Sequence, residues 1–159
     1  PADVLRQMAT DITSIEEAED IARQMIEVVS KFATGAGLAA TQIGITKRVI
    51  CIRRNDEYWV IVNPVITESS GTALSSEGCL STPNLWGVVE RYADITITGV
   101  DTKLQPIVEK LSGFEAFVTQ HEIDHLDGIM FFDRAKPETL VWNSKALGKS
   151  QPATFARSG

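Results

Sequence analysis

The sequence predicts an α+β fold built as a single domain, and three observations lead to this prediction. The chain has 159 residues, a length that suits one domain with its own hydrophobic core. Two stretches, near residues 20 and 120, are typical of helices. Between them lie short β-branched runs that are typical of strands, so the expected order is one helix, several strands and a second helix.

The first helix is expected from about residue 14 to residue 34. Thr13 and Ser14 stand before Glu16 and Glu17, and either register forms a capping box. The apolar residues of this stretch recur at helical spacing. They are Ile15, Ala18, Ile21, Ala22, Met25, Val28, Val29 and Phe32. Gly35 is placed to end the helix.

Four strands are expected after this helix, and they span residues 48–54, 58–68, 93–100 and 104–111. Asn55-Asp56 suits a turn between the first two strands, and Asp101-Thr102-Lys103 suits a turn between the last two. The second helix is expected from about residue 112 to 126, with Gly128 beyond its end.

Composition is that of an ordinary globular protein and gives no indication of a membrane protein. Hydrophobic residues make up 43% of the chain and charged residues 23%. No apolar run approaches the roughly 20 residues that span a bilayer. The segment Pro1–Arg6 has neither secretory nor transit character, so a cytoplasmic location is expected. Two cysteines are too few for a disulfide framework.

Charge is unevenly distributed along the chain. The net charge of −6 argues against general nucleic-acid binding, and no specific DNA partner is expected. Residues 134–159 carry five basic side chains and one acidic side chain, a net charge of +4, whereas residues 1–133 carry −10. We therefore expect a compact domain over residues 1–133 and a basic, partly disordered tail over residues 134–159. The tail includes a weak helical stretch near residues 138–147 and a mobile end at 148–159.

The two histidines of the chain are the strongest indication of chemistry. They stand in the run His121-Glu122-Ile123-Asp124-His125, and on a helix residues i and i+4 share one face, so both imidazoles can bind one metal ion. Accidental spacing is the alternative. Zinc proteases with this motif take a third ligand downstream, but Phe131 stands at one such position and Glu138 lies beyond Pro137. The third ligand is therefore expected earlier in the chain.

Cys79 is the better candidate for this third ligand. Cys51 lies in the apolar run Val49–Ile52, where a cysteine is usually a small core residue. Cys79 lies in Glu77–Ser81, after a stretch rich in Ser, Thr and Gly, where backbone can approach an active site; a buried thiol at a strand end is the alternative. One Cys and two His with an open fourth position form a catalytic arrangement, since structural sites fill all four positions with protein ligands.

A glycine-rich segment, Gly35–Gly44, follows the first helix. It is not a phosphate loop, because it lacks the Gly-Lys-Ser/Thr ending. Its small residues would let a substrate backbone lie close, unless they mark only a helix end and tight packing. Gln42 could donate its amide to a developing oxyanion.

Together these segments resemble the motifs of the peptide deformylases, here Gly35–Gln42, Glu77–Ser81 and Gln120–His125 followed by Gly128. The resemblance covers about residues 1–133. It implies a catalytic domain with mixed or antiparallel β-sheets around a central helix that carries His-Glu-x-x-His, plus an N-terminal helix. It also implies removal of the N-formyl group from the formylmethionine of newly synthesised polypeptides, with release of formate. The implied ion is Fe²⁺, and Ni²⁺, Co²⁺ or Zn²⁺ can substitute.

The resemblance also assigns roles to residues. The implied metal ligands are Cys79, His121 and His125. Glu122 is expected to transfer the proton, and Gln42 and the Leu80 N–H are expected to stabilise the oxyanion. The implied substrate-binding residues are Ala36, Gly37, Gly78, Phe114, Phe117 and Val118. Plain core packing is the alternative for the last three.

Two features depart from the family pattern. Trp86 stands where many members have Arg or Tyr, so the substrate contacts there are open. The long charged C-terminal helix through which bacterial members dock on the ribosome has no match, because Pro137, Gly148 and Pro152 interrupt the tail. The basic tail after Asp133 is expected to be unnecessary for the chemistry and either to contact ribosomal RNA or to fold back on the acidic domain.

Two other functions remain open from the sequence, a metallopeptidase and a non-catalytic metal-binding protein. The lack of a third His or Glu ligand counts against the first. Glu122 and Gln42, which a structural site would not need, count against the second. A further expectation concerns Asp124, which lies on another face of the helix from the two histidines. An acid that faces the protein needs a partner, and Arg91 is the expected one.

Overall fold

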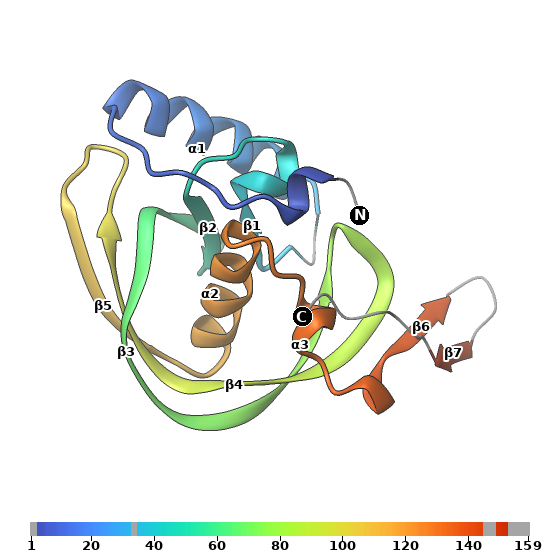
Figure 1. The fold of residues 1–159 in the computed structure, drawn as a ribbon. Coiled ribbons are helices and arrows are strands. Elements are labelled where there is room, and N and C mark those ends of the chain that lie inside the picture. The colour runs from blue at the N-terminus through green and yellow to red at the C-terminus, as the bar shows by residue number, and fades with distance from the viewer. Residues whose placement is uncertain (1–2, 33–34, 145–148, 153–159) are drawn as a thin grey trace.

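The structure, a computed structural model, describes residues 3–32, 35–144 and 149–152. Figure 1 shows helix α2 at the centre, with the long bent strands β3 and β4 curving past it and α1 along the top of the view. The helices and strands are α1 (Ile15–Val29), β1 (Gly37–Ala39), β2 (Val49–Arg54), β3 (Glu57–Cys79), β4 (Thr82–Val100), β5 (Pro106–Ser112), α2 (Gly113–Leu126), α3 (Phe131–Arg134), β6 (Val141–Ser144) and β7 (Lys149–Pro152). The short 3-10 helices are η1 (Asp3–Arg6), η2 (Ala40–Ile43) and η3 (Pro137–Thr139).

The strands form one sheet in the order β1-β2-β3-β4-β6-β7, with β5 paired to β4. Adjacent named strands in the described residues pair antiparallel. The predicted α+β class and the central helix are confirmed. No described helix is long and apolar enough to cross a membrane.

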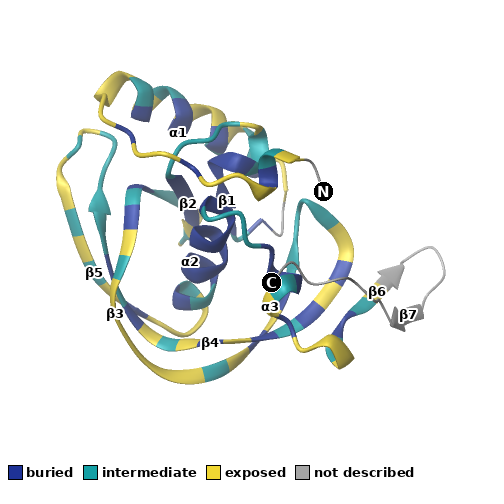
Figure 2. Ribbon diagram, in the orientation of Figure 1, coloured by how far each residue is buried: buried dark blue, intermediate teal, exposed yellow. Residues whose placement is uncertain are grey.

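Strand β2 is buried on both faces because it lies between the two long helices. Successive side chains of a strand point to opposite faces. Ile50 and Ile52 belong to the apolar cluster that includes α2, whereas Val49 and Cys51 belong to the cluster that includes α1. Figure 2 shows the burial that results, with α2 enclosed and α1 exposed on its outer face. Every residue of α2 from Val118 to Leu126 is buried.

Helix α1 begins where the sequence predicts and ends earlier. Ser14 is its N-cap, and the Ser14 side chain accepts a hydrogen bond from the Glu17 N–H. The helix ends at Val29 instead of near residue 34, which lies outside the described residues. The hydroxyl of Ser30 donates to the carbonyl of Glu27. The N–H groups of Lys31 and Phe32 then bond to the carbonyls three residues earlier, instead of four as in an α-helix. The α-helical ladder therefore stops before Gly35.

Strands β3 and β4 are much longer than predicted. The structure extends them through residues 69–79 and 82–92, which the sequence left outside the strands. The stretch Ser69–Thr72 is exposed and has few apolar side chains, so it lacks the alternation that marks a strand. The hydrogen-bonded pairing shifts register between Val62 and Val65, between Ile66 and Glu68 and between Gly78 and Cys79. Such irregularities bend a strand, and here they accompany its curved path around α2.

The turn predictions are confirmed, and the helical prediction for the tail is wrong. Asn55 and Asp56 both have positive φ, 50° and 61°, as a two-residue hairpin turn between β2 and β3 requires. The Leu104 N–H donates to the Asp101 carbonyl in the turn before β5. Residues 138–144 contain the end of η3 and strand β6, because Val141 and Trp142 pair with β4. Residues 145–147 of that prediction lie outside the described part, as do 148 and 153–159 of the predicted mobile end.

Candidate active site

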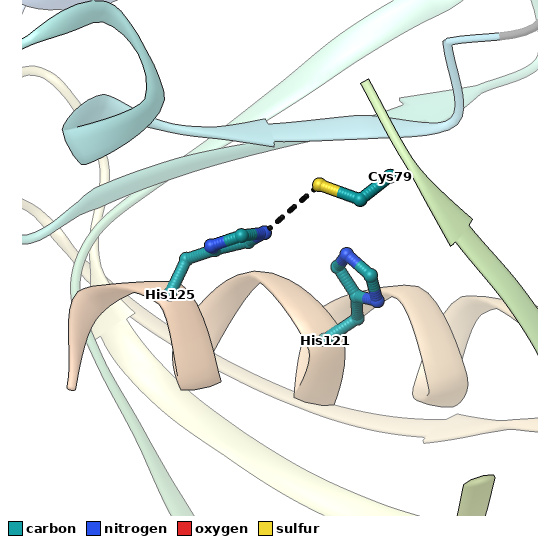
Figure 3. A group of neighbouring side chains, drawn as sticks. All are labelled: Cys79, His121 and His125. Atoms are coloured by element: carbon teal, nitrogen blue, oxygen red, sulfur yellow. Dashed lines mark hydrogen bonds between the residues drawn. The ribbon is translucent and has the colours of Figure 1, made fainter. Parts of the chain in front are cut away.

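The three predicted metal ligands lie together at the end of β3 and on α2. Figure 3 shows the imidazoles of His121 and His125 and the thiol of Cys79 pointing toward one another. One ligand atom from each residue lies within 4.8 Å of the others. The Cys79 sulfur is 3.3 Å from Nε2 of His125. The pairing of β3 with β4 shifts register between Gly78 and Cys79, at the end of β3 that carries the thiol.

The donor set fits a single divalent ion. With metal–sulfur and metal–nitrogen bonds of about 2.3 and 2.0 Å, a tetrahedral ion would hold sulfur and nitrogen about 3.5 Å apart. The observed separation of 3.3 Å between Cys79 and His125 is close to that value. Thiolate and imidazole suit Fe²⁺, Ni²⁺, Co²⁺ and Zn²⁺, whereas Mg²⁺ and Ca²⁺ prefer oxygen ligands.

Glu122 lies beside the three ligands and keeps one oxygen without a partner. Its side chain is buried, and its Oε1 has no hydrogen-bond partner among the described residues. A Cβ at Gly37 would lie 3.0 Å from Oε2 of Glu122 and 2.9 Å from Val118. A glycine is therefore needed at position 37 for β1 to pass this close to the carboxylate.

The side-chain amide of Gln42 is held in one orientation by a hydrogen bond from the backbone. Its Oε1 accepts a hydrogen bond of 2.9 Å from the Ala39 N–H. This leaves Nε2 to face the site, where it lies 3.4 Å from the Cys79 sulfur and donates to Oγ of Ser81 at 3.1 Å. The amide group therefore offers a donor beside the three candidate ligands. Ser81 was not singled out by sequence reasoning.

A buried network of charges stands behind His121. Oε1 of Glu77 lies 2.8 Å from Nδ1 of His121, so the imidazole is left with Nε2 for a metal. Arg91 donates to both oxygens of Glu77, at 2.9 and 2.7 Å, and to Asp124 at 2.6 Å. The predicted pairing of Asp124 with Arg91 is thus confirmed. Arg134 adds two further hydrogen bonds to Asp124, at 2.7 and 3.0 Å.

Sequence reasoning missed the position of Glu77 in this network, although a signal was present. Glu77 and Cys79 are two residues apart on β3, so both side chains point to the same face of the strand. Once Cys79 is a candidate ligand, Glu77 is expected to point toward the same site. The longer strand that makes this argument possible was itself not predicted.

Burial and neighbouring charges shift the pKa of several groups in the site. Burial is the largest influence on Glu122 and raises its carboxyl pKa to about 7, against the opposing effect of His121. Burial lowers the pKa of His125 to about 3. Burial would also lower the pKa of His121, but its hydrogen bonds with Cys79 and Glu77 outweigh burial and raise that pKa to about 10. Burial would raise the pKa of Glu77, but the hydrogen bonds from Arg91 and His121 outweigh it and lower that pKa to about 2. A proton acceptor and a permanent carboxylate thus lie within one site.

The site opens into a cavity of about 470 Å³. All six predicted substrate-binding residues line it, together with Gln42, Cys79, Leu80, His121 and Glu122. The structure therefore brings these residues to one place, although their roles stay predictions. Phe32 and Trp86 also line the cavity, and sequence reasoning did not assign them a substrate contact. Cys51 lies outside it, fully buried, and burial raises its thiol pKa to about 12.

The chain is similar to proteins of known family over most of its length. The family described as polypeptide deformylase matches residues 1–140. A peptide deformylase of Rhodopirellula baltica is 39% identical over 146 residues, which cover 88% of this chain and 72% of that protein. One from Dictyoglomus thermophilum is 40% identical over 143 residues, which cover 89% of this chain and 93% of that protein.

Solved structures give the same result for the fold. The crystal structure of peptide deformylase from Thermus thermophilus matches with a TM-score of 0.79 and 39% identity, covering 84% of this chain and 80% of that one. The crystal structure from Thermotoga maritima matches with a TM-score of 0.80 and 35% identity, covering 84% and 92% of the two chains.

Proposed function

Since this chain belongs to the polypeptide deformylase family, we propose that Cys79, His121 and His125 hold the catalytic metal ion and that Glu122 transfers the proton. The family removes the formyl group from the N-terminal formylmethionine of newly synthesised polypeptides and releases formate, and this is the activity of the chain. The proposal concerns which residues perform the reaction. The observation that carries it is the convergence of three ligand atoms beside a carboxylate oxygen that has no partner in the described structure.

A divalent ion held by these three residues would supply Lewis acidity, which polarises the formyl carbonyl and lowers the pKa of a water molecule to near neutrality. The Glu122 carboxylate is placed to accept the proton of the attacking water at its unpaired Oε1. A pKa near 7 suits a group that accepts a proton and then delivers it to the leaving amine.

Gln42 and Leu80 are the proposed donors to the oxygen of the formyl group. Nε2 of Gln42 faces the site because Ala39 fixes the other end of the amide. Leu80 follows Cys79 directly and lines the same cavity, so its N–H is the second proposed donor. Donors that are fixed before the reaction stabilise the negative oxygen without reorganising.

The methionine side chain has an apolar region of the cavity available to it. Phe117 and Val118, from the helix that carries His121, line the cavity, as do Ala36 and Gly37. Phe114 also lines it and is 69% exposed, so it lies nearer to solvent. We assign the methionine side chain to the Phe117 and Val118 side.

The ion that we propose for this site is Fe²⁺, with Ni²⁺, Co²⁺ or Zn²⁺ able to replace it. One thiolate and two imidazoles suit all four ions. Because the substrate is a chain newly made on the ribosome, a cytoplasmic location is proposed as well. A contact between the basic residues after Asp133 and ribosomal RNA is proposed from their charge of +4.

Release of formate from a formyl-Met-Ala peptide tests the proposed function. The matched substrates are acetyl-Met-Ala and the free amine Met-Ala in otherwise identical peptides. We expect formate from the first peptide, little turnover of the second and no cleavage of the Met-Ala bond in any of them. Cleavage of that peptide bond would instead indicate a metallopeptidase, and metal binding without turnover of any peptide would indicate a binding protein.

A further inference from the structure

The first residues of β4 form one wall of the catalytic cavity. Five consecutive residues, Thr82–Trp86, line it. On one side this segment pairs with the end of β3, since Thr82 is the partner of Cys79 and Trp86 is the partner of Gly78. The wall is thus attached directly to the strand that carries the cysteine ligand.

The other side of this wall is held by residues 135–142, beyond the predicted domain boundary. The Lys136 N–H donates to the Val88 carbonyl, and the Val88 N–H donates to Oγ1 of Thr139, both at 2.9 Å. Strand β6 then continues the contact, with Val141 paired to Trp86 and Trp142 paired to Leu85. Residues 135–142 therefore hold the backbone of the wall from its outer side.

Side-chain packing fixes the distance between the two segments. Leu140 and Ala135 are buried in the same apolar cluster as Leu85. A Cβ at Gly87 would approach Leu140 to 2.8 Å and Ala135 to 3.1 Å, so the segments touch without a side chain between them. Because packed interiors resist compression, residues 82–86 are expected to move whenever residues 135–142 move.

Trp86 is the side chain that this arrangement presents to the substrate. Its ring lies against Gly78, where a Cβ would be 3.1 Å from three ring carbons. The side chain is 45% exposed although it lines the cavity, and Phe32 and Phe114, also cavity residues, are 45% and 69% exposed. These exposed rings mark the mouth. Among the described lining residues the charged side chains are Glu77 and Glu122, and both are buried.

We propose that Trp86 determines specificity for the residue that follows formylmethionine and that residues 135–142 position it. This inference rests on the proposed function. A peptide whose methionine lies on the Phe117 side leaves the cavity past the uncharged, aromatic mouth. An aromatic residue after methionine packs on the indole of Trp86, whereas an alanine does not reach it. Aromatic pairs contribute about 0.5–1.5 kcal/mol beyond area burial, which corresponds to about a fivefold preference.

Two substrates and substitutions at two positions, Trp86 and Thr139, test the proposal. In the unsubstituted protein, kcat/KM for formyl-Met-Phe amide is expected to exceed that for formyl-Met-Ala amide about fivefold, through KM. Trp86→Ala abolishes this ratio. Thr139→Val removes the hydroxyl that accepts from the Val88 N–H, and because a hydrogen bond contributes about 1 kcal/mol, equivalent to about fivefold, it is expected to lower the ratio by up to about fivefold. Thr139→Ser keeps the hydroxyl and restores the ratio.

The double variant separates positioning from a general structural role. If Thr139 acts through Trp86, then Thr139→Val has no further effect on the ratio once Trp86 is alanine. Tyr92→Ala is the control for Trp86→Ala, since Tyr92 lies on the same strand, is 49% exposed and does not line the cavity. Thr67→Val is the control for Thr139→Val, because the Thr67 hydroxyl also bonds to backbone in this sheet. Neither control is expected to change the ratio.

Several results would overturn the proposal. If Trp86→Ala keeps the fivefold ratio of kcat/KM between the two substrates, Trp86 does not determine specificity. Thr139→Val could also lower kcat/KM equally for both substrates, both in the unsubstituted protein and in Trp86→Ala. Residues 135–142 would then support the structure without affecting specificity. If the unsubstituted protein released formate from neither peptide, the proposed function would fail together with this inference, whereas turnover of both peptides at equal kcat/KM would overturn this inference alone.

Discussion

At the scale of single residues, the surroundings of Glu122 suit its carboxylate to proton transfer. Its carboxyl group is buried, one oxygen lies close to the backbone of Gly37 and the other has no partner among the described residues. Burial raises its pKa to about 7, which makes the carboxylate a stronger base than an exposed glutamate. The motif in the sequence predicts this carboxylate beside the metal ligands, but its burial depends on Gly37, which lies 85 residues earlier in the numbering.

Glu122→Gln tests the role of this carboxylate. The substitution keeps the size of the side chain and removes the proton acceptor, so kcat for a formyl-Met peptide is expected to fall about 10²–10⁴-fold. Metal content is expected to stay near that of the unsubstituted protein, because the three proposed ligands are unchanged. Metal analysis and turnover are measured on the same sample. Loss of the metal would make Glu122 a ligand, and near-full activity would exclude it as the proton acceptor.

The residues of the site differ in how far the sequence reveals them. The histidine pair and Cys79 follow from ligand chemistry and from helical spacing. Glu77 and Ser81 do not, because their roles depend on a strand register and on an amide orientation that form only in the folded chain. Cys51 was assigned to the core from its apolar neighbours, and its complete burial confirms that prediction.

At the scale of elements, Asp124 joins helix α2 to strand β4 and to α3. It bonds to Arg91 of β4 at 2.6 Å and to Arg134 of α3 at 2.7 and 3.0 Å. Since Arg91 also bonds to Glu77, the same guanidinium connects α2 to the strand that carries Cys79. The two elements that supply the proposed ligands are therefore held in register by one buried arginine.

Asp124→Asn is expected to destabilise the fold strongly. Arg91 has a side chain that is 3% exposed, and the substitution leaves this buried cation with one carboxylate partner fewer. Breaking a buried ion pair costs about 3–5 kcal/mol, and in a chain of this length that lowers Tm by about 10 °C. Thermal unfolding at equal metal occupancy gives the comparison. Asp20→Asn, in the exposed pair with Arg23, is the control, and an equal Tm for the two variants would contradict the assignment.

Strands are predictable here where the sequence carries a local signal. Residues 49–52 form a continuous apolar run and residues 93–100 alternate, and both are found in strands. Ser69–Thr72 carry neither pattern, because this stretch of β3 is exposed and polar on both faces. Pairing with β4, and not local preference, makes it a strand. The same reason explains β6, where pairing with Leu85 and Trp86 overrides a weak helical pattern.

At the scale of the whole molecule, the apolar clusters explain how the parts of the chain share one fold. Helices α1 and α2 pack on opposite faces of β2, and a third cluster joins Leu85 and Val89 to Phe131 and Leu140. The predicted boundary after residue 133 stays a prediction. The third cluster crosses that boundary, so residues 135–140 share a core with the wall of the cavity.

Deletion of residues 148–159 tests how much of the basic tail the reaction needs. Cavity residues and the segment 135–142 remain in this variant. Turnover of a short formyl-Met peptide is therefore expected to stay nearly unchanged, while binding to ribosomes weakens if the basic residues contact RNA. A loss of peptide turnover would show that the deleted residues belong to the catalytic domain.

Metal stoichiometry against formate release tests the central claim most directly. The protein is stripped with a chelator and titrated anaerobically with Fe²⁺ or Ni²⁺, and formate release from formyl-Met-Ala is measured at each ratio. Activity is expected to rise linearly and to level off at about one ion per chain, because Cys79, His121 and His125 form a single three-ligand site with an open position. Cys79→Ala is expected to bind little metal and stay inactive, while Cys51→Ala follows the unsubstituted protein. Full metal binding and activity in Cys79→Ala, or full activity in the stripped protein, would contradict the account.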